Sequence, residues 1–296
     1  MNPYVLSCCS TFDLDKEYFE KRNIFYACFH FSINGKNYTD DLGQSISFKD
    51  FYKTISQKDT EVKTSQVNVG EFIEYFTSFL EKGLDILHVS LSSGLSGVYN
   101  SALIAKKELE EKFPERKIYI VDSLAASSGG GLLMDKLADL RDNGKTIDEL
   151  FNWAEENKLN LNHWFFSTDL SFYIRGGRIS KAAGFVGTLL KICPILNVNS
   201  QGKLTPILKV RTKAKAIEEA FKKMKENAQN GENYAECCFI SHSDCYEDAK
   251  ALADLIEKHF THLKDKLKIN NIGTTIGSHT GPGTVALFFW GKKRTN

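Results

Sequence analysis

The stretch HVSLSSGLSGVYNSALIAKKELEE, residues 88–111, passes from an apolar run through a loop of serines and glycines into a segment with helical apolar spacing. A strand, a polar loop and a helix in that order form the unit from which α/β folds are built. The first backbone N–H groups of such a helix lack partners within the helix, and they attract anions. The stretch therefore predicts an α/β fold and a candidate anion site in its loop.

The rest of the chain repeats this alternation of short apolar runs and longer amphipathic segments. The pattern predicts a two-lobed α/β protein with a mostly parallel sheet in the N-terminal lobe, because 296 residues exceed the usual span of one core. The polar segment EENKLNL, residues 155–161, has no apolar period, so we expect lobes at 1–157 and 158–296. The predicted strands are 86–90, 118–121, 164–166 and 239–241, and the predicted helices are 70–82, 96–113, 212–229 and 244–262.

The composition argues against several classes of protein. The 38 Lys and Arg nearly balance the 37 Asp and Glu, which disfavours a nucleic-acid partner. No apolar run reaches the roughly 18 to 20 residues of a membrane span, and the start of the chain lacks signal-peptide blocks, so we expect a cytoplasmic protein. The seven cysteines lack zinc-site spacing and are expected to be reduced and structural. The basic tail GKKRTN, residues 291–296, is expected to be a solvated terminus.

The serine loop supports two interpretations. Ser92, Ser93 and Ser96 supply hydroxyl donors, and Gly94 allows a tight turn. No Lys or Arg lies between residues 89 and 105, so the loop does not match a nucleotide phosphate cradle, and a singly charged or neutral group suits it better. The alternative is that Ser96 only caps the helix, which is a common role for serine.

Two other segments offer similar donors. The run KTSQ, residues 63–66, contributes Thr64 and Ser65, and the run GSHTGPG, residues 277–283, contributes His279 and Thr280 at the end of an apparent strand. Hydroxyls and one imidazole suit hydrogen bonding to a carboxyl group. A serine hydrolase that uses His279 as its base is the alternative, although the GxSxG nucleophile elbow is absent.

The stretch YIRGGRIS, residues 173–180, places Arg175 and Arg178 on either side of a diglycine turn. Guanidinium groups offer paired donors, so this turn suits a phosphate or the acidic surface of a partner protein. The alternative is that both are ordinary surface arginines.

The motifs KTSQ, LSSGLSGVYNSA, VDS before a glycine-rich helix, YIRGGRIS and HTGPG occur in an order that resembles the DegV family. The resemblance implies two α/β lobes that bury one long-chain fatty acid, such as palmitate, stearate or oleate, between or within them. It implies no cofactor, no metal and no catalysis by the chain itself. The carrier would take the fatty acid from the membrane surface and present its carboxylate to a dihydroxyacetone-kinase-like fatty acid kinase, for acyl-phosphate formation and phospholipid synthesis in a bacterium.

The resemblance also implies roles for individual residues. Thr64 or Ser65, Ser93 with its loop neighbours Ser92, Gly94 and Ser96, and His279 with Thr280 would hold the carboxylate. Arg175 and Arg178 would face the kinase. One departure is that Cys9 stands where the family commonly has an aspartate. A lipid-sensing or storage protein without a kinase, and a serine esterase, are the alternative functions.

Overall fold

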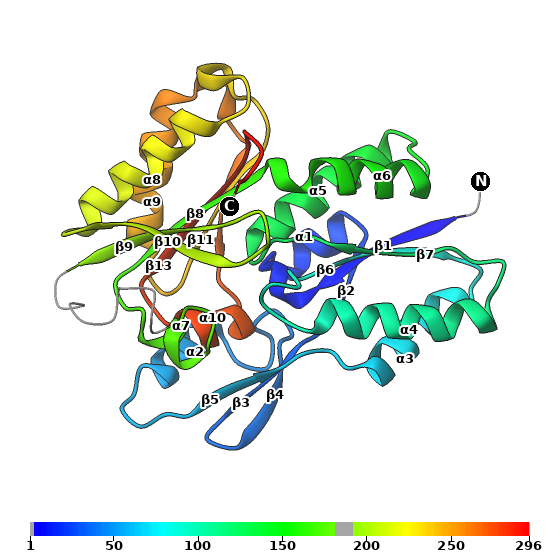
Figure 1. Cartoon of the computed structure of the whole chain (residues 1–296). Helices are drawn as coiled ribbons and strands as arrows, with labels where there is room; N and C mark the ends of the chain where they lie inside the picture. Colours follow the sequence, from blue (N-terminus) through cyan, green and yellow to red (C-terminus); the bar gives the residue numbers. More distant parts are fainter. Residues whose placement is uncertain (1–2, 181–191, 296) are drawn as a thin grey trace.

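The computed structural model describes residues 3–180 and 192–295. Its N-terminal part holds a four-stranded parallel sheet with the order β2-β1-β6-β7, which confirms the predicted α/β class (Figure 1). All residues of β6 are buried, as expected for a parallel strand that is covered on both faces. The strands are β1 (Tyr4–Cys9), β2 (Ile24–Ala27), β6 (Asp85–Ser90) and β7 (Ile118–Asp122).

Helices cover both faces of this sheet. Because side chains alternate along a strand, Val5 and Cys9 of β1 pack with α3 and α4, whereas Leu6 and Cys8 pack with α5 and α6. The helices are α1 (Lys16–Lys21), α3 (Val69–Leu80), α4 (Val98–Lys112), α5 (Ser128–Asp142) and α6 (Ile147–Asn157).

A six-stranded sheet with the order β10-β9-β8-β13-β11-β12 forms the second lobe. Its strand pairs are antiparallel except for β11 with β12. Helices α8 and α9 lie on one face of this sheet, and α5 lies on the other, between the two sheets (Figure 1). The elements are β8 (Leu161–Ser167), β9 (Cys193–Val198), β10 (Leu204–Val210), α8 (Lys213–Asn227), β11 (Cys238–His242), α9 (Tyr246–His259), β12 (Leu267–Asn271) and β13 (Thr284–Trp290).

Helix α5 joins the lobes through glycines at its start. A Cβ on Gly130 would lie 2.2 Å from the ring of Phe12, and a Cβ on Gly129 would lie 2.3 Å from the imidazole of His163. Only glycine therefore lets this helix approach both the N-terminal lobe and the second sheet so closely.

A small antiparallel sheet, β4-β3-β5, completes the fold. Helix α10 comes from the C-terminal half of the chain but packs against β3, β5 and α2. The sequence suggested a strand just before His279 and Thr280, and that expectation is wrong, because both residues belong to α10. The elements are β3 (His30–Ile33), β4 (Lys36–Thr39), α2 (Phe48–Ile55), β5 (Val62–Ser65), α7 (Ser171–Arg175) and α10 (Thr274–Thr280).

Two buried aspartates explain why α10 is a helix. Asp13 accepts a hydrogen bond from the Gly273 N–H at 3.0 Å, and Asp40 accepts one from the Thr274 hydroxyl at 2.7 Å. These bonds satisfy donors at the start of α10. They come from residues more than 200 positions earlier in the chain, so the local sequence did not reveal them.

The predicted strands and helices lie at their expected places with small shifts at the ends. The segment 155–161 is the end of α6 and the 3₁₀ turn Lys158–Asn160, and it leads into the first strand of the second sheet. In the sequence, the strands of the four-stranded and three-stranded sheets precede this turn, and the strands of the six-stranded sheet follow it. The lobe boundary between residues 157 and 158 stays a prediction.

The C-terminal tail is a solvated terminus only in part, because Lys292, Lys293 and Thr295 are exposed whereas Arg294 is buried. Arg294 is only 8% exposed, and its guanidinium donates to main-chain carbonyl oxygens of both lobes. The expectation is wrong for Arg294 because the charge and length of the tail do not show which main-chain carbonyl groups elsewhere in the fold need a donor. Within the described residues, no helix is long and apolar enough to cross a membrane.

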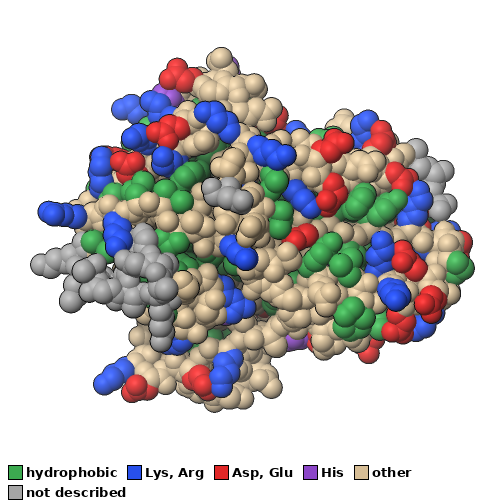
Figure 2. Space-filling view, viewed as in Figure 1, with side chains coloured by type: hydrophobic (Ala, Val, Ile, Leu, Met, Phe, Trp, Pro, Cys, Tyr) green, Lys and Arg blue, Asp and Glu red, His purple; other side chains and the backbone are tan. Residues whose placement is uncertain are grey.

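Charged side chains of both signs are interspersed over the face shown in Figure 2. This distribution agrees with the net charge of +1. The seven cysteines are free thiols, and Cys8, Cys9, Cys193 and Cys238 are buried.

Candidate site for a carboxylate and an apolar tail

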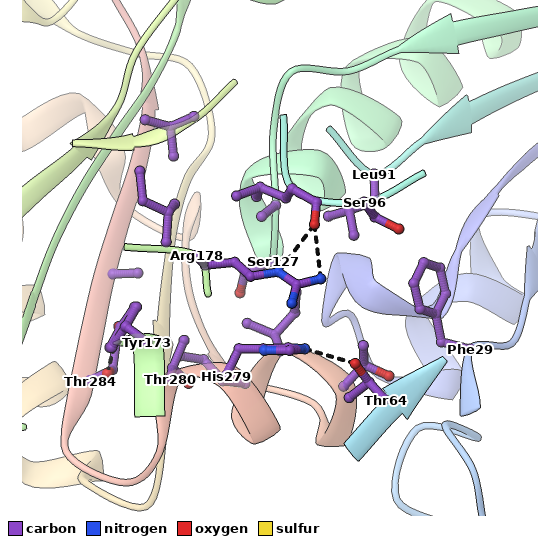
Figure 3. Close-up of a pocket in the computed structure, with 18 of the residues that line it drawn as sticks. Phe29, Thr64, Leu91, Ser96, Ser127, Tyr173, Arg178, His279, Thr280 and Thr284 are labelled. Atoms are coloured by element: carbon purple, nitrogen blue, oxygen red, sulfur yellow. Dashed lines mark hydrogen bonds between the residues drawn. The ribbon is translucent and has the colours of Figure 1, made fainter. Parts of the chain in front are cut away.

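A cavity of about 370 Å³ lies between the two lobes (Figure 3). This volume falls within the range of roughly 300 to 1,000 Å³ that is usual for small-molecule sites. Most of its wall is apolar, and the apolar residues come from both lobes. They are Phe29, Leu91, Leu95, Ala126, Phe165, Val198, Leu204, Ile272, Ile276, Ala286 and Phe288.

Strand geometry supplies one wall of the cavity. Thr284, Ala286 and Phe288 alternate along β13, so their side chains share one face of the six-stranded sheet. His163 and Phe165 of the neighbouring β8 lie on the same face, opposite Phe288 and Ala286. The resulting surface suits an extended hydrocarbon chain.

One part of the cavity is polar. His279 and Thr280 of α10, Thr64 of β5, Ser96 of the serine loop and Arg178 of the diglycine turn all line it. The His279 Nε2 and Thr64 Oγ1 atoms are 2.7 Å apart, so α10 and β5 meet through this hydrogen bond (Figure 3). The structure therefore brings together members of all four polar motifs.

His279 is neutral at physiological pH. Burial lowers the pKa of its imidazole to about 4, and the nearby Arg178 charge adds to this effect. Its Nδ1 atom has no hydrogen-bond partner among the described residues, and it faces Gly176, where a Cβ would lie 2.3 Å away. The imidazole can therefore act as a hydrogen-bonding group without adding charge.

Arg178 brings a cation to the polar part of the cavity. Its Nε and Nη2 atoms donate to the Leu95 carbonyl at 3.2 and 3.1 Å (Figure 3). Its Nη1 atom donates to the Gly176 carbonyl. None of the ion pairs in the described part of the chain includes Arg178. Burial lowers its pKa, but an arginine keeps its proton at neutral pH. A cation without an anionic partner beside a cavity favours an anionic ligand.

Ser96 is held by Gln66, a residue that the sequence reasoning did not single out. The Ser96 hydroxyl donates to Gln66 Oε1 at 3.0 Å, and the Gln66 amide donates to the Ser101 hydroxyl at 2.9 Å. Ser96, one residue before the N-cap Gly97, also accepts from the Val98 N–H at 3.2 Å. Ser96 therefore both contacts the first residue of α4 and lines the cavity.

Ser92, Ser93 and Gly94 of the same loop do not line the cavity. The Ser92 hydroxyl donates to the Gly202 carbonyl at 2.8 Å, and Gly94 packs against the same turn of the second lobe. Ser93 is exposed, and its N–H donates to Asp122 at 3.0 Å. Within the serine loop, the structure thus separates Ser96 from three residues that the sequence grouped with it.

Ser65 and the two arginines also take different positions. Ser65 follows Thr64 on β5, lines the cavity and is exposed. Arg175 is exposed outside the cavity lining, and its guanidinium lies over the Phe172 ring at 4.4 Å. Arg178 lies in the cavity wall instead of on the open surface. A role for either arginine in partner binding stays a prediction.

A serine hydrolase needs a serine beside the catalytic histidine. The hydrogen-bond partner of His279 is the threonine hydroxyl of Thr64, and in the described chain no serine of the loop is bonded to it. The geometry therefore favours binding over nucleophilic chemistry.

Cys9, which stands where the DegV family commonly has an aspartate, does not replace the carboxylate of that aspartate. The thiol lies 3.8 Å from Nε2 of the buried His88, and burial raises the pKa of Cys9 to about 12. Buried carboxyl groups instead come from Asp13 and Asp40, whose pKa values are raised because burial disfavours their charge. Asp40 also accepts a hydrogen bond from Ser10, next to Cys9, at 3.1 Å.

A fold of two α/β lobes around a mostly apolar cavity with a few polar groups defines a class of small-molecule-binding proteins. The family model described as "Uncharacterised protein, DegV family" matches residues 9–292. The chain belongs to the DegV family.

Three relatives illustrate the match. A DegV domain-containing protein of Clostridium perfringens is 40% identical over 291 residues, 98% of each chain. A protein of Thermotoga maritima named a fatty acid-binding protein is 35% identical over 238 residues, 79% of each chain. The Streptococcus pneumoniae Fatty Acid Kinase (Fak) B3 protein loaded with linoleic acid has a TM-score of 0.85 at 20% identity, over 98% of this chain and 100% of that one, which shows a shared fold.

Proposed function

We propose that this protein is a carrier that binds one long-chain fatty acid and presents its carboxylate to a fatty acid kinase in the cytoplasm. The observation that carries the proposal is the cavity between the lobes, with its mostly apolar wall and its cluster of hydroxyl, imidazole and guanidinium groups. The 35% identical Thermotoga relative supports the ligand class.

The apolar tail supplies most of the affinity. Burying the methylenes of a sixteen-carbon acid at roughly 0.8 kcal/mol each gives about 11 kcal/mol of gross driving force. Each hydrogen bond at the head group adds about 1 kcal/mol, and a bond from a charged donor adds more. The head group therefore sets the orientation of the ligand and selects acids over alcohols and esters.

Four residues form the proposed carboxylate site, namely Thr64, Ser96, Arg178 and His279. Arg178 supplies the positive charge, and the Thr64 hydroxyl and the neutral His279 supply hydrogen bonds. Ser96, fixed by Gln66, adds a hydroxyl to the wall. Thr280, which also lines the cavity, closes this end.

The carrier itself performs no chemistry in this proposal. The kinase transfers a phosphoryl group from ATP to the carboxylate, and the acyl-phosphate then serves phospholipid synthesis. The fold shared with the Streptococcus FakB3 protein supports a kinase partner, and the exposed Arg175 is a candidate contact. The fatty acid would come from a transient contact with a membrane surface.

Native mass spectrometry of the protein purified from its own cells tests the ligand. We expect one bound species of about 250 to 290 Da for each chain, as for a C16 or C18 acid filling a single pocket. Incubation of the loaded protein with ATP and a fatty acid kinase should then yield acyl-phosphate. A protein that carries no acyl chain, and takes up none from palmitate-containing vesicles, would refute the carrier.

A further inference from the structure

Arg294 places a buried guanidinium at the junction of the two lobes. Its Nη1 atom donates to the carbonyl oxygens of Leu124 at 3.0 Å, Asn199 at 3.1 Å and Val198 at 3.2 Å, and Nη2 donates to that of Lys158 at 3.3 Å. No ion pair in the described residues includes this side chain. Burial lowers its pKa to about 10, so it remains charged at neutral pH.

The four carbonyl groups belong to three segments that meet beside the cavity. Leu124 follows β7 in the N-terminal lobe, two residues before the cavity-lining Ala126. Val198 ends β9 in the second lobe and lines the cavity itself. Lys158 lies in the turn that connects the lobes. One side chain therefore ties opposite walls of the cavity to the connection between them.

The main chain around Arg294 fixes its position. Its own N–H donates to the Leu159 carbonyl at 2.8 Å, and the Thr295 carbonyl accepts from the Ser200 N–H at 3.3 Å. The guanidinium is thus anchored on both sides of its residue.

A second bond crosses the same boundary. The Ser92 hydroxyl donates to the Gly202 carbonyl at 2.8 Å, and the Gly202 N–H donates to the Asn199 carbonyl, which Arg294 also contacts. A Cβ on Gly202 would lie 2.0 Å from Ser92 Oγ, so the Ser92 side chain packs directly against the Gly202 backbone. Opening the cavity along this edge requires both contacts to break.

We propose that Arg294 is an interlobe clamp that limits how fast an acyl ligand enters and leaves the cavity. The ligand part of this inference rests on the proposed function. A planar guanidinium can serve several carbonyl groups at once, whereas a lysine ammonium is a compact charge on a flexible stem. Arg294 does not line the cavity, so the clamp controls the rate of exchange more than the affinity.

The test compares Arg294→Met and the milder Arg294→Lys with Arg116→Met in the full-length protein. Arg116 is the control within one lobe, because its guanidinium is also largely buried and donates to the Gly83 carbonyl, although it also pairs with Asp85. Amide hydrogen exchange of residues 92–97 and 199–204 is measured without ligand. In parallel, native mass spectrometry follows the replacement of bound palmitate by deuterated palmitate.

Both rates should rise about tenfold or more in Arg294→Met, less in Arg294→Lys, and by under about twofold in Arg116→Met. The palmitate dissociation constant should change by less than about threefold. Unchanged amide exchange in Arg294→Met, or an equal rise in Arg116→Met, would overturn the clamp. If wild-type protein binds no palmitate, the carrier proposal fails, while the amide measurement still decides whether the clamp exists.

Discussion

The most informative prediction concerns Arg178, the cation in the cavity wall. Replacing it by methionine keeps much of the side-chain length and removes the charge. A hydrogen bond to a charged group contributes about 1.5 to 3 kcal/mol, which corresponds to roughly 10- to 150-fold in affinity. Because the group is only partly buried and therefore partly screened by solvent, we expect Arg178→Met to weaken palmitate binding by about tenfold, near the lower limit.

The assay measures competition of palmitic acid and of hexadecanol against a fluorescent fatty acid. The alcohol has the same tail but no negative charge, so its affinity for Arg178→Met should stay within about threefold of wild type. Arg175→Met is the matched control, since Arg175 lies three residues away and outside the cavity lining. It should leave the binding of both ligands unchanged and lower only the rate of the kinase reaction.

The alternative to a ligand contact is that Arg178 has a purely structural role. Its bonds to the Leu95 and Gly176 carbonyls also fix the diglycine turn against the serine loop. If that were its only role, the mutation would weaken acid and alcohol equally, and this result would refute a charge contact with the ligand.

Three further predictions test residues that position the polar groups of the site. Gly176→Ala should displace His279, because a Cβ would lie 2.3 Å from its Nδ1 atom, and we expect palmitate binding to fall while circular dichroism shows an intact fold. The pKa of His279 is about 4 in the folded state and about 6.5 in the unfolded state. Between these two pH values only the unfolded state gains a proton as the pH falls, so the unfolding free energy decreases. His279→Gln should therefore reduce the pH dependence of the unfolding free energy, measured with urea between pH 6.5 and 4, by about 1.4 kcal/mol per pH unit; an unaltered slope would contradict a buried neutral imidazole. Asp40→Ala removes the acceptor of the Ser10 and Thr274 hydroxyls, so it should lower palmitate affinity and should lower the unfolding free energy by about 2 to 4 kcal/mol. Asp41→Ala, at a half-buried turn, should change both quantities less.

Part of the site could be predicted from the sequence. The apolar period of the segments and the turn residues between them indicated the helices that flank the serine loop and the strand that precedes it. The residue types also indicated a carboxyl group, because hydroxyls and an imidazole without a lysine do not suit a nucleotide phosphate. The order of the motifs pointed to the family that the matched model confirms.

The roles within each motif could not be predicted in the same way. Ser92, Ser93 and Ser96 are equivalent by type and spacing, yet only Ser96 lines the cavity, because the turn at Gly202 occupies the space in front of Ser92. Gln66 gave no signal of its own, since its partner Ser96 lies 30 residues away. The sequence pattern also fits a surface position for Arg178, whereas the structure places Arg178 in the cavity wall.

By itself, the amino-acid sequence determined the α/β class, helices α3, α4, α8 and α9, two strands of each of the two larger sheets and the chemical types of the site residues. These features depend on the local period of apolar residues, which is visible within a few turns of a helix or strand. Only the tertiary structure decided that α10 is a helix, that His279 meets Thr64 across 215 positions, and that Arg294 is buried between the lobes. Each of these depends on donors and acceptors supplied by distant segments, and buried polar groups take whichever partners the fold brings to them.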